Sequence, residues 1–160
     1  MAKYIKPTFS FTANANSATT DPGPMSFGLT LSTTPTADAS GRLTVDVVEQ
    51  DVITVTTTTT NIVDGSAHIG SGVGGTDGCW IYLKNITVSG SYKIYIGFVA
   101  DGDTSDIAAD GSGTSRAFTL NRGEFAFFPY DYTGDITVET DNNGSGDTVP
   151  KLEMWRFDRG

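Results

Sequence analysis

The chain contains one histidine and one cysteine, so any chemistry that needs either side chain depends on a single residue. His68 lies in a segment rich in glycine and serine, and no nucleophile elbow accompanies it, so a Ser-His-Asp triad is disfavoured. A cage of several histidines around a metal is excluded. Cys79 precedes Trp80 in an apolar stretch, which favours a small buried hydrophobic residue over a reactive thiol. The sequence predicts a protein that is not an enzyme, with no catalytic residues and no cofactor.

An acidic loop offers the oxygen ligands that calcium takes in proteins. An EF-hand loop counted from the first of its aspartates needs Gly at its sixth position and Glu at its twelfth, where this chain has Asp106 and Ser112. This mismatch favours a solvated acidic loop over a metal site. The calcium candidates are Asp101, Asp103, Asp106 and Asp110.

Aromatic residues gather towards the carboxyl end of the chain. A glycosidase would place them in a cleft with two facing carboxylates, but nothing in the sequence pairs particular carboxylates. Large aromatic side chains commonly anchor protein interfaces, so we expect the segment 125–130 to pack on a core and on a neighbouring molecule. The predicted interface residues are Phe125, Phe127, Phe128, Tyr130, Tyr132, Trp155 and Phe157.

The elements that must position these residues are predicted to be strands. Runs of helix-forming residues at a 3.6-residue period do not occur, whereas apolar and polar residues alternate with a period of two. Turn residues separate these segments, which indicates one all-β domain over residues 1–160, an antiparallel β-sandwich or barrel, with residues 1–7 as an extended arm. The predicted strands cover residues 8–13, 25–32, 43–47, 52–58, 79–83, 85–88, 92–98, 116–120, 124–128, 135–139 and 151–157.

A β-hairpin is predicted over residues 85–98. With Ser89–Ser91 as a three-residue turn, Val88 would lie opposite Tyr92, and one buried face would continue across both strands.

The threonine-rich run 56–60 has strand propensity but no apolar face, which indicates an edge strand. The stretches 65–78 and 100–115, rich in glycine, serine and aspartate, are predicted to be long loops.

The net charge of −9 and the pI near 4.3 disfavour nucleic acid and anionic membrane surfaces as partners, because the ten basic residues are dispersed. An acidic surface of this kind favours solubility. A single cysteine forms no intramolecular disulfide, so folding in a reducing cytoplasm is expected. No stretch approaches the length of an apolar membrane span, and no export signal is evident.

The second half of the chain contains a characteristic series of strands and turns. A strand ending in Leu-Lys-Asn is followed by Ile-Gly, then Leu-x-x-Gly-Glu, Phe-Pro, a short acidic strand and a closing Leu-Glu-x-Trp-x-Phe. These segments are residues 80–85, 96–98, 120–125, 128–129, 135–138 and 152–157. This series resembles that of small virion structural proteins of tailed bacteriophages, which decorate or cement capsids.

The resemblance implies a jelly-roll-like fold, a homotrimer and a non-enzymatic role. It implies a capsid decoration protein that is made in the host cytoplasm, binds the major capsid protein on the capsid surface and stabilises the shell. It covers about the second half of the chain, so the attachment surface is not assigned by it.

An alternative function from the same residues is carbohydrate recognition. In this alternative the chain is a sugar-binding β-sandwich module of a tail fibre or cell-surface protein. Tyr130, Tyr132 or Trp155 would stack on sugar rings, and the loop 101–110 would hold calcium.

Overall fold

The computed structural model describes residues 3–11, 25–32, 43–68, 78–103, 107 and 115–159. The chain divides into two compact units, Met1–Asp46 and Val47–Gly160. The helical elements of the described residues are one turn of α-helix, α1 (Gly65–His68), and one 3-10 turn, η1 (Gly146–Thr148). Among these residues, no helix is long and apolar enough to cross a membrane.

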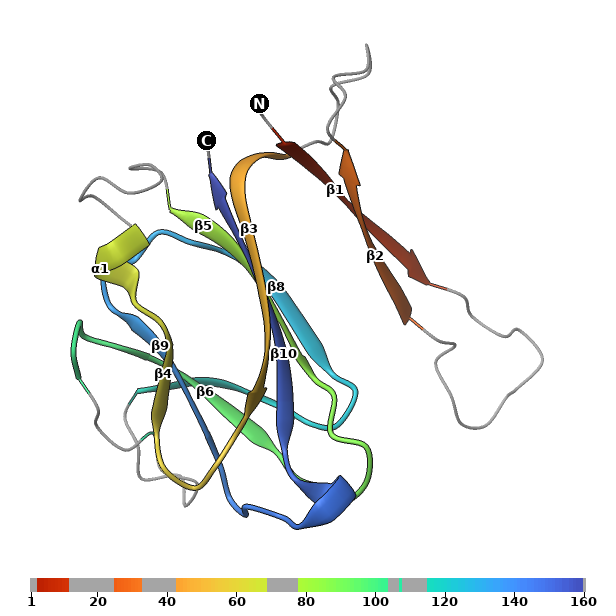
Figure 1. The fold of residues 1–160 in the computed structure, drawn as a ribbon, viewed down its shortest axis with the longest axis vertical. Helices are drawn as coiled ribbons and strands as arrows, with labels where there is room; N and C mark the ends of the chain where they lie inside the picture. Colours follow the sequence, from red (N-terminus) through yellow and green to blue (C-terminus); the bar gives the residue numbers. More distant parts are fainter. Residues whose placement is uncertain are drawn as a thin grey trace. The chain divides into compact units, whose positions relative to one another are not determined.

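The second unit contains two antiparallel sheets (Figure 1). One sheet consists, in spatial order, of the later part of β3 (Leu43–Thr54), β10 (Lys151–Arg159), β5 (Cys79–Asn85) and β8 (Phe125–Tyr130). The other consists of β4 (Thr60–Val63), β9 (Asp135–Thr140), β6 (Ile94–Val99) and β7 (Arg116–Leu120).

The strand order follows a nested pairing. Strand β3 neighbours β10, β4 pairs with β9, β5 with β8 and β6 with β7, so the chain from β7 to β10 returns alongside the chain from β3 to β6. Rolling such a long hairpin sends alternate pairs to opposite sheets, which gives a jelly roll of two four-stranded sheets. The predicted all-β, antiparallel, jelly-roll-like sandwich is confirmed.

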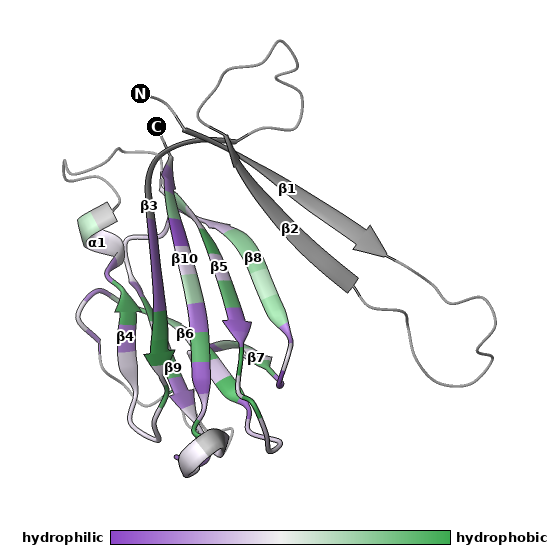
Figure 2. Ribbon diagram, turned by 45° about the vertical axis from the view of Figure 1, so that its right-hand side comes forward, coloured by the Kyte–Doolittle hydropathy of each residue, from purple (hydrophilic) through white to green (hydrophobic). Residues whose placement is uncertain are grey.

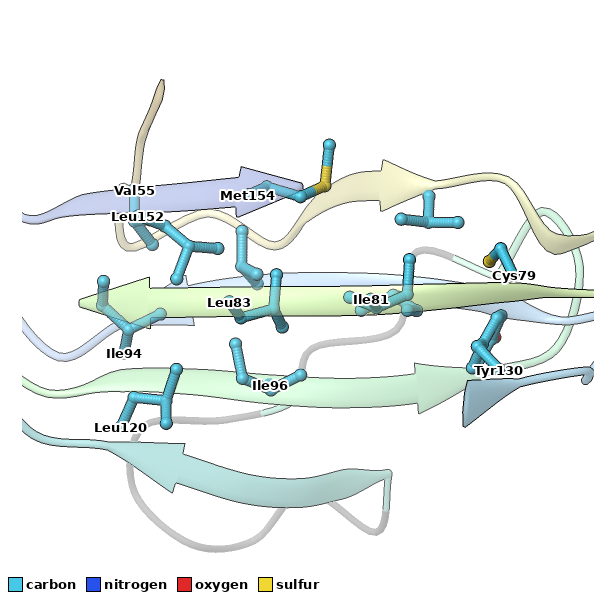
Figure 3. Close-up of a cluster of buried hydrophobic side chains, with 13 residues drawn as sticks. Val55, Cys79, Ile81, Leu83, Ile94, Ile96, Leu120, Tyr130, Leu152 and Met154 are labelled. Carbon is cyan, nitrogen blue, oxygen red and sulfur yellow. The ribbon is translucent and has the colours of Figure 1, made fainter. Parts of the chain in front are cut away.

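The core lies between the two sheets and follows from the alternation of side chains along each strand. On β5, Cys79, Ile81 and Leu83 have no exposed surface, and they meet Ile94 and Ile96 of β6 in one cluster (Figure 3). The prediction that Cys79 is a buried small hydrophobic residue is confirmed.

The hairpin predicted over residues 85–98 is wrong. Strand β5 ends at Asn85 and pairs with β10 and β8, whereas β6 begins at Ile94 in the other sheet and pairs with β7 and β9. Residues 86–93 therefore cross between the sheets, and Val88, expected to be buried, is 71% exposed. The alternation of apolar residues was compatible with a hairpin, but the nested roll gives both strands other partners.

Asn85 marks the point where the chain leaves its sheet. Its buried side-chain Nδ2 donates to the carbonyl oxygens of Tyr92 (3.2 Å) and Leu120 (3.0 Å). Its Oδ1 accepts hydrogen bonds from the backbone N–H of Thr87 (3.1 Å) and from the Thr87 hydroxyl (2.6 Å). These bonds satisfy backbone groups at and beside the crossing.

The threonine-rich run was also misassigned. Residues 56–59 form a connection rather than a strand, and the edge strand is β4, which begins at Thr60. The Thr56 carbonyl oxygen accepts from Thr140 N–H (3.0 Å), and Thr57 N–H donates to Asn143 Oδ1 (2.7 Å). The connection therefore bonds to the end of β9 and to the turn after it.

The predicted long loops differ from expectation in two places. The first begins with the helical turn α1. In the second, Ile107 is fully buried and packs with Tyr95 and Val99 on the outer side of the sheet that contains β6. A buried isoleucine gives this loop an apolar anchor that its polar composition did not indicate.

The first unit contains β1 (Lys3–Phe11) and β2 (Met25–Ser32), which pair antiparallel, and the first residues of β3, which pair with β1. The sequence predicted a single domain with an arm over residues 1–7. In the structure, β1 already begins at Lys3, and these residues belong to a separate compact unit.

We expect Asn85→Ala to lower the free energy of unfolding by about 3 kcal/mol, because the carbonyl oxygens of Tyr92 and Leu120 lose their buried partner. Urea denaturation followed by tryptophan emission measures the loss. The exposed Asn61→Ala should stay within about 0.5 kcal/mol of the parent chain. Equal stabilities of the two variants would contradict the role of Asn85.

Candidate functional site

The outer side of the sheet β3-β10-β5-β8 is the main concentration of exposed or half-buried aromatic rings among the described residues. Strands β5, β8 and β10 turn alternate residues towards the core and away from it, an alternation that the hydropathy colours display along β10 and β5 (Figure 2). The outward positions form a surface that we call the aromatic face. It consists of Trp80, Tyr82, Phe125, Phe127, Trp155 and Phe157.

Cross-strand register arranges the aromatic face in rows. In the central row, Trp155 of β10 lies opposite Tyr82 of β5, which lies opposite Phe127 of β8. Phe127 also stacks on Trp80, with ring centroids 5.5 Å apart and planes 11° from parallel. Cross-strand aromatic neighbours of this kind stabilise a sheet and hold the rings in fixed orientations.

Trp155 and Phe157 stack along β10 in the same way, with centroids 6.1 Å apart and planes at 15°. Trp80, Phe125, Phe127 and Trp155 are half-buried, while Tyr82 and Phe157 are buried. The aromatic face is therefore a set of stacked rings, some of them partly exposed and able to pack against another molecule.

A carboxylate and an amine lie beside the rings. Glu153 of β10 stands opposite Lys84 of β5 in the register, and Glu153 Oε1 accepts a hydrogen bond from Trp155 Nε1 at 3.0 Å. Burial, followed by the negative charge of Glu153, raises the pKa of Tyr82 to about 12. The hydroxyl of Tyr82 is thus a neutral donor throughout the physiological range.

A shallow groove of about 350 Å³ borders the aromatic face, between β3 and β10. Gln50, Asp51 and Val52 of β3 line it, together with Glu153 and Trp155 of β10. The groove combines an indole ring with carboxamide and carboxylate residues, which is the mixture of stacking and hydrogen-bonding groups that sugar sites use.

The predicted interface residues separate into three places. Phe125, Phe127, Trp155 and Phe157 belong to the aromatic face. Tyr132 lies in the turn after β8 and is 49% exposed.

Phe128 and Tyr130 point to the core side of β8 and contact Phe98 of β6, at centroid distances of 5.7 and 5.6 Å. The Tyr130 hydroxyl donates to the Gly134 carbonyl oxygen at 2.7 Å, and burial raises its pKa. Both rings therefore lie on the core side of β8, where Tyr130 is buried and Phe128 is half-buried.

Trp80 and Tyr82 were missed as members of the aromatic face, although a signal for them was present. They alternate with Cys79, Ile81 and Leu83, so a period of two already places them on the opposite side of the strand. The neighbouring strands that line them up with Phe127 and Trp155 could not be read from the local sequence.

The structure also brings together three carboxylates, Asp64, Asp101 and Asp135, whose ligand atoms lie within 4.8 Å of one another. Asp64 follows β4, Asp101 follows β6 and Asp135 begins β9. Asp135 is buried, and its two oxygens accept the backbone N–H groups of Gly65 (3.3 Å) and Gly102 (3.0 Å). It thus joins the ends of β4 and β6 to β9.

Two of the calcium candidates, Asp101 and Asp103, are among the described residues, and of these two Asp101 belongs to this acidic group. Asp103 follows it in the loop, and Asp106 and Asp110 lie outside the described residues. Calcium takes six to eight oxygen ligands, so three carboxylates supply part of a site at most. Calcium binding by this loop stays a prediction.

His68 lies in the α1 turn, and Cys79 is buried at the start of β5. No protein family, curated protein or solved structure matches this chain.

The raised pKa of Tyr82 predicts a loss of stability at alkaline pH. The neutral phenol is favoured in the folded protein, so this contribution is complete below pH 10 and is lost as the pH rises through about 12. Urea unfolding at intervals from pH 9 to pH 12 should show a smaller loss for Tyr82→Phe than for the parent. Identical pH profiles would contradict the burial of Tyr82 beside Glu153.

Proposed function

We propose that this chain is a non-enzymatic virion structural protein, a capsid decoration protein of a tailed bacteriophage. In this proposal it sits on the capsid surface as a homotrimer, binds the major capsid protein and stabilises the shell. The resemblance of residues 78–157 to such proteins motivates the assignment.

The observation that carries the proposal is the aromatic face. Hot spots of protein interfaces are enriched in tryptophan and tyrosine, and they lie in packed patches from which water is excluded. Trp80, Phe127 and Trp155 provide half-buried rings on three adjacent strands, so one flat partner surface could cover them together. The rings are already ordered by stacking, which reduces the entropy lost on binding.

The fold and the charge support the same function. Jelly rolls form viral capsid domains and lectins, although a fold alone does not define a function. The acidic surface suits a protein displayed at high density, because like charges keep its copies from aggregating.

Replacement of one ring tests the proposal. We expect Phe127→Ser to raise the dissociation constant for capsids assembled without the protein by about 30-fold, because a central aromatic contact contributes about 2 kcal/mol. Co-sedimentation of the purified chain with these capsids measures the constant.

The matched control is Val88→Ser, which removes an apolar side chain that is 71% exposed in the crossing after β5, outside the aromatic face. It should bind like the parent chain. If the parent chain fails to sediment with capsids and is absent from purified particles, the proposal fails. If Phe127→Ser, still folded, binds as tightly as the parent, attachment uses another surface.

A second candidate function is supported by the groove beside Trp155. There a sugar ring could stack on the indole while Gln50 and Glu153 provide hydrogen-bonding groups. In this alternative the chain is a carbohydrate-binding module of a tail fibre or cell-surface protein.

A glycan array probed with and without a calcium chelator separates the two functions. Sugar binding that is lost in Trp155→Leu would favour the carbohydrate module. Capsid binding without any glycan signal would favour decoration.

A further inference from the structure

The segment after β9 contains an asparagine followed by a glycine, Asn143-Gly144, and this pair occurs once in the chain. The Asn143 side chain is exposed, and its Oδ1 accepts a hydrogen bond from the Thr57 backbone N–H at 2.7 Å. The Gly144 N–H donates to Asn142 Oδ1 at 2.9 Å, which forms an Asx turn. The pair therefore shapes the turn after β9 and also joins it to the connection 56–59.

The fold constrains both members of the pair. Gly144 has a φ of 61°, in the left-handed region that side chains other than glycine rarely adopt. A Cβ at this position would also collide with the carbonyl oxygen of Thr148. Position 143 has to provide an acceptor on a short side chain, because that atom is the partner of the Thr57 N–H. The turn thus requires the order Asn-Gly.

An asparagine in this setting can lose its side-chain amide without an enzyme. Water removes the Gly144 N–H proton, and the nitrogen attacks Cγ of Asn143. The new N–Cγ bond closes a five-membered imide, while the bond from Cγ to the side-chain nitrogen breaks and ammonia leaves with the proton. A second water opens the imide at either of its carbonyls. The products are aspartate and isoaspartate, and no oxidant or reductant takes part.

Two features of the structure favour this reaction at Asn143. Gly144 has no side chain, so nothing on the attacking residue shields its nitrogen from Cγ. The Thr57 N–H already donates to Oδ1, the oxygen on which negative charge develops when Cγ is attacked. A donor fixed at such an oxygen before the attack stabilises the charged intermediate, as in an oxyanion hole.

We propose that Asn143 is a site of spontaneous deamidation in the folded protein, with Thr57 as the positioning residue that stabilises the charged intermediate. The proposal is independent of the proposed function, because it rests on the contacts of residues 57 and 142–144 alone. Deamidation at this site adds one negative charge to a chain whose net charge is −9.

The two products differ at the Thr57 contact. Aspartate keeps an oxygen on the same side-chain carbon, so it still accepts the Thr57 N–H, now in a charge-assisted hydrogen bond. Isoaspartate carries its carboxylate directly on Cα and continues the main chain through Cβ, which shortens the side chain and lengthens the backbone. It therefore loses the Thr57 bond. The connection then keeps the hydrogen bond from Thr140 N–H to the Thr56 carbonyl oxygen (3.0 Å).

Incubation of the folded chain at mildly alkaline pH tests the proposal, with tryptophan emission used to confirm that the sandwich stays folded. Peptide mass spectrometry locates each residue that exchanges an NH group for oxygen, and electron-transfer fragmentation distinguishes aspartate from isoaspartate. The internal control is Asn121, another exposed turn asparagine, which is followed by Arg122. We expect deamidation at Asn143 to be at least about 10-fold faster than at Asn121, with both products present.

Two variants serve as matched controls. Asn143→Gln should lose the mass change at this position, because its longer side chain does not close the five-membered imide. Asn143→Asp reproduces one product and should unfold at the same urea concentration as the parent, because its carboxylate still accepts the Thr57 N–H.

Three results would overturn the proposal. The first is an Asn143 that stays unmodified in the folded chain while it deamidates in the urea-unfolded chain. The second is an equal rate at Asn143 and Asn121. The third is aspartate without isoaspartate, which would show direct hydrolysis of the amide and no attack by Gly144.

Discussion

Strand β5 is paired on both sides, and its side chains must therefore alternate strictly between the two faces of its sheet. Cys79, Ile81 and Leu83 fill the space between the sheets, and Asn85 ends the same row by binding backbone groups at the crossing. The intervening Trp80 and Tyr82 are placed outside, beside the rings of β8 and β10. Core and aromatic face thus depend on one register, and a shift by one residue would exchange them.

The net charge is divided unevenly between the two units. The sandwich combines a strongly acidic composition, which favours solubility, with a few ordered aromatic rings on the outer side of one sheet. The first unit carries no net charge, because residues 1–46 contain three basic and three acidic side chains.

Much of the fold could be predicted from the sequence because alternation is local. Strands β2, β7, β9 and β10 lie close to where the period of two and the turn residues placed them. The partners of each strand could not be predicted this way, because β5 and β6 look like a hairpin until the whole roll sets their neighbours. The candidate site was likewise predicted only as far as local sequence allows. Phe127 and Trp155 were predicted as interface aromatics, but the sequence did not show that they share one face of a sheet. The meeting of Asp64, Asp101 and Asp135 also depends on residues far apart in sequence.

Radical footprinting of the aromatic rings tests the central claim, that the outer side of the sheet β3-β10-β5-β8 is the contact surface. Hydroxyl radicals oxidise exposed tryptophan and phenylalanine side chains, and mass spectrometry locates the oxidised residues. The account predicts that oxidation of Trp80, Phe127 and Trp155 falls when the protein is attached to capsids, while that of Tyr132, in the turn after β8, does not. Equal oxidation of those three rings in the free and attached protein, with protection elsewhere, would contradict it.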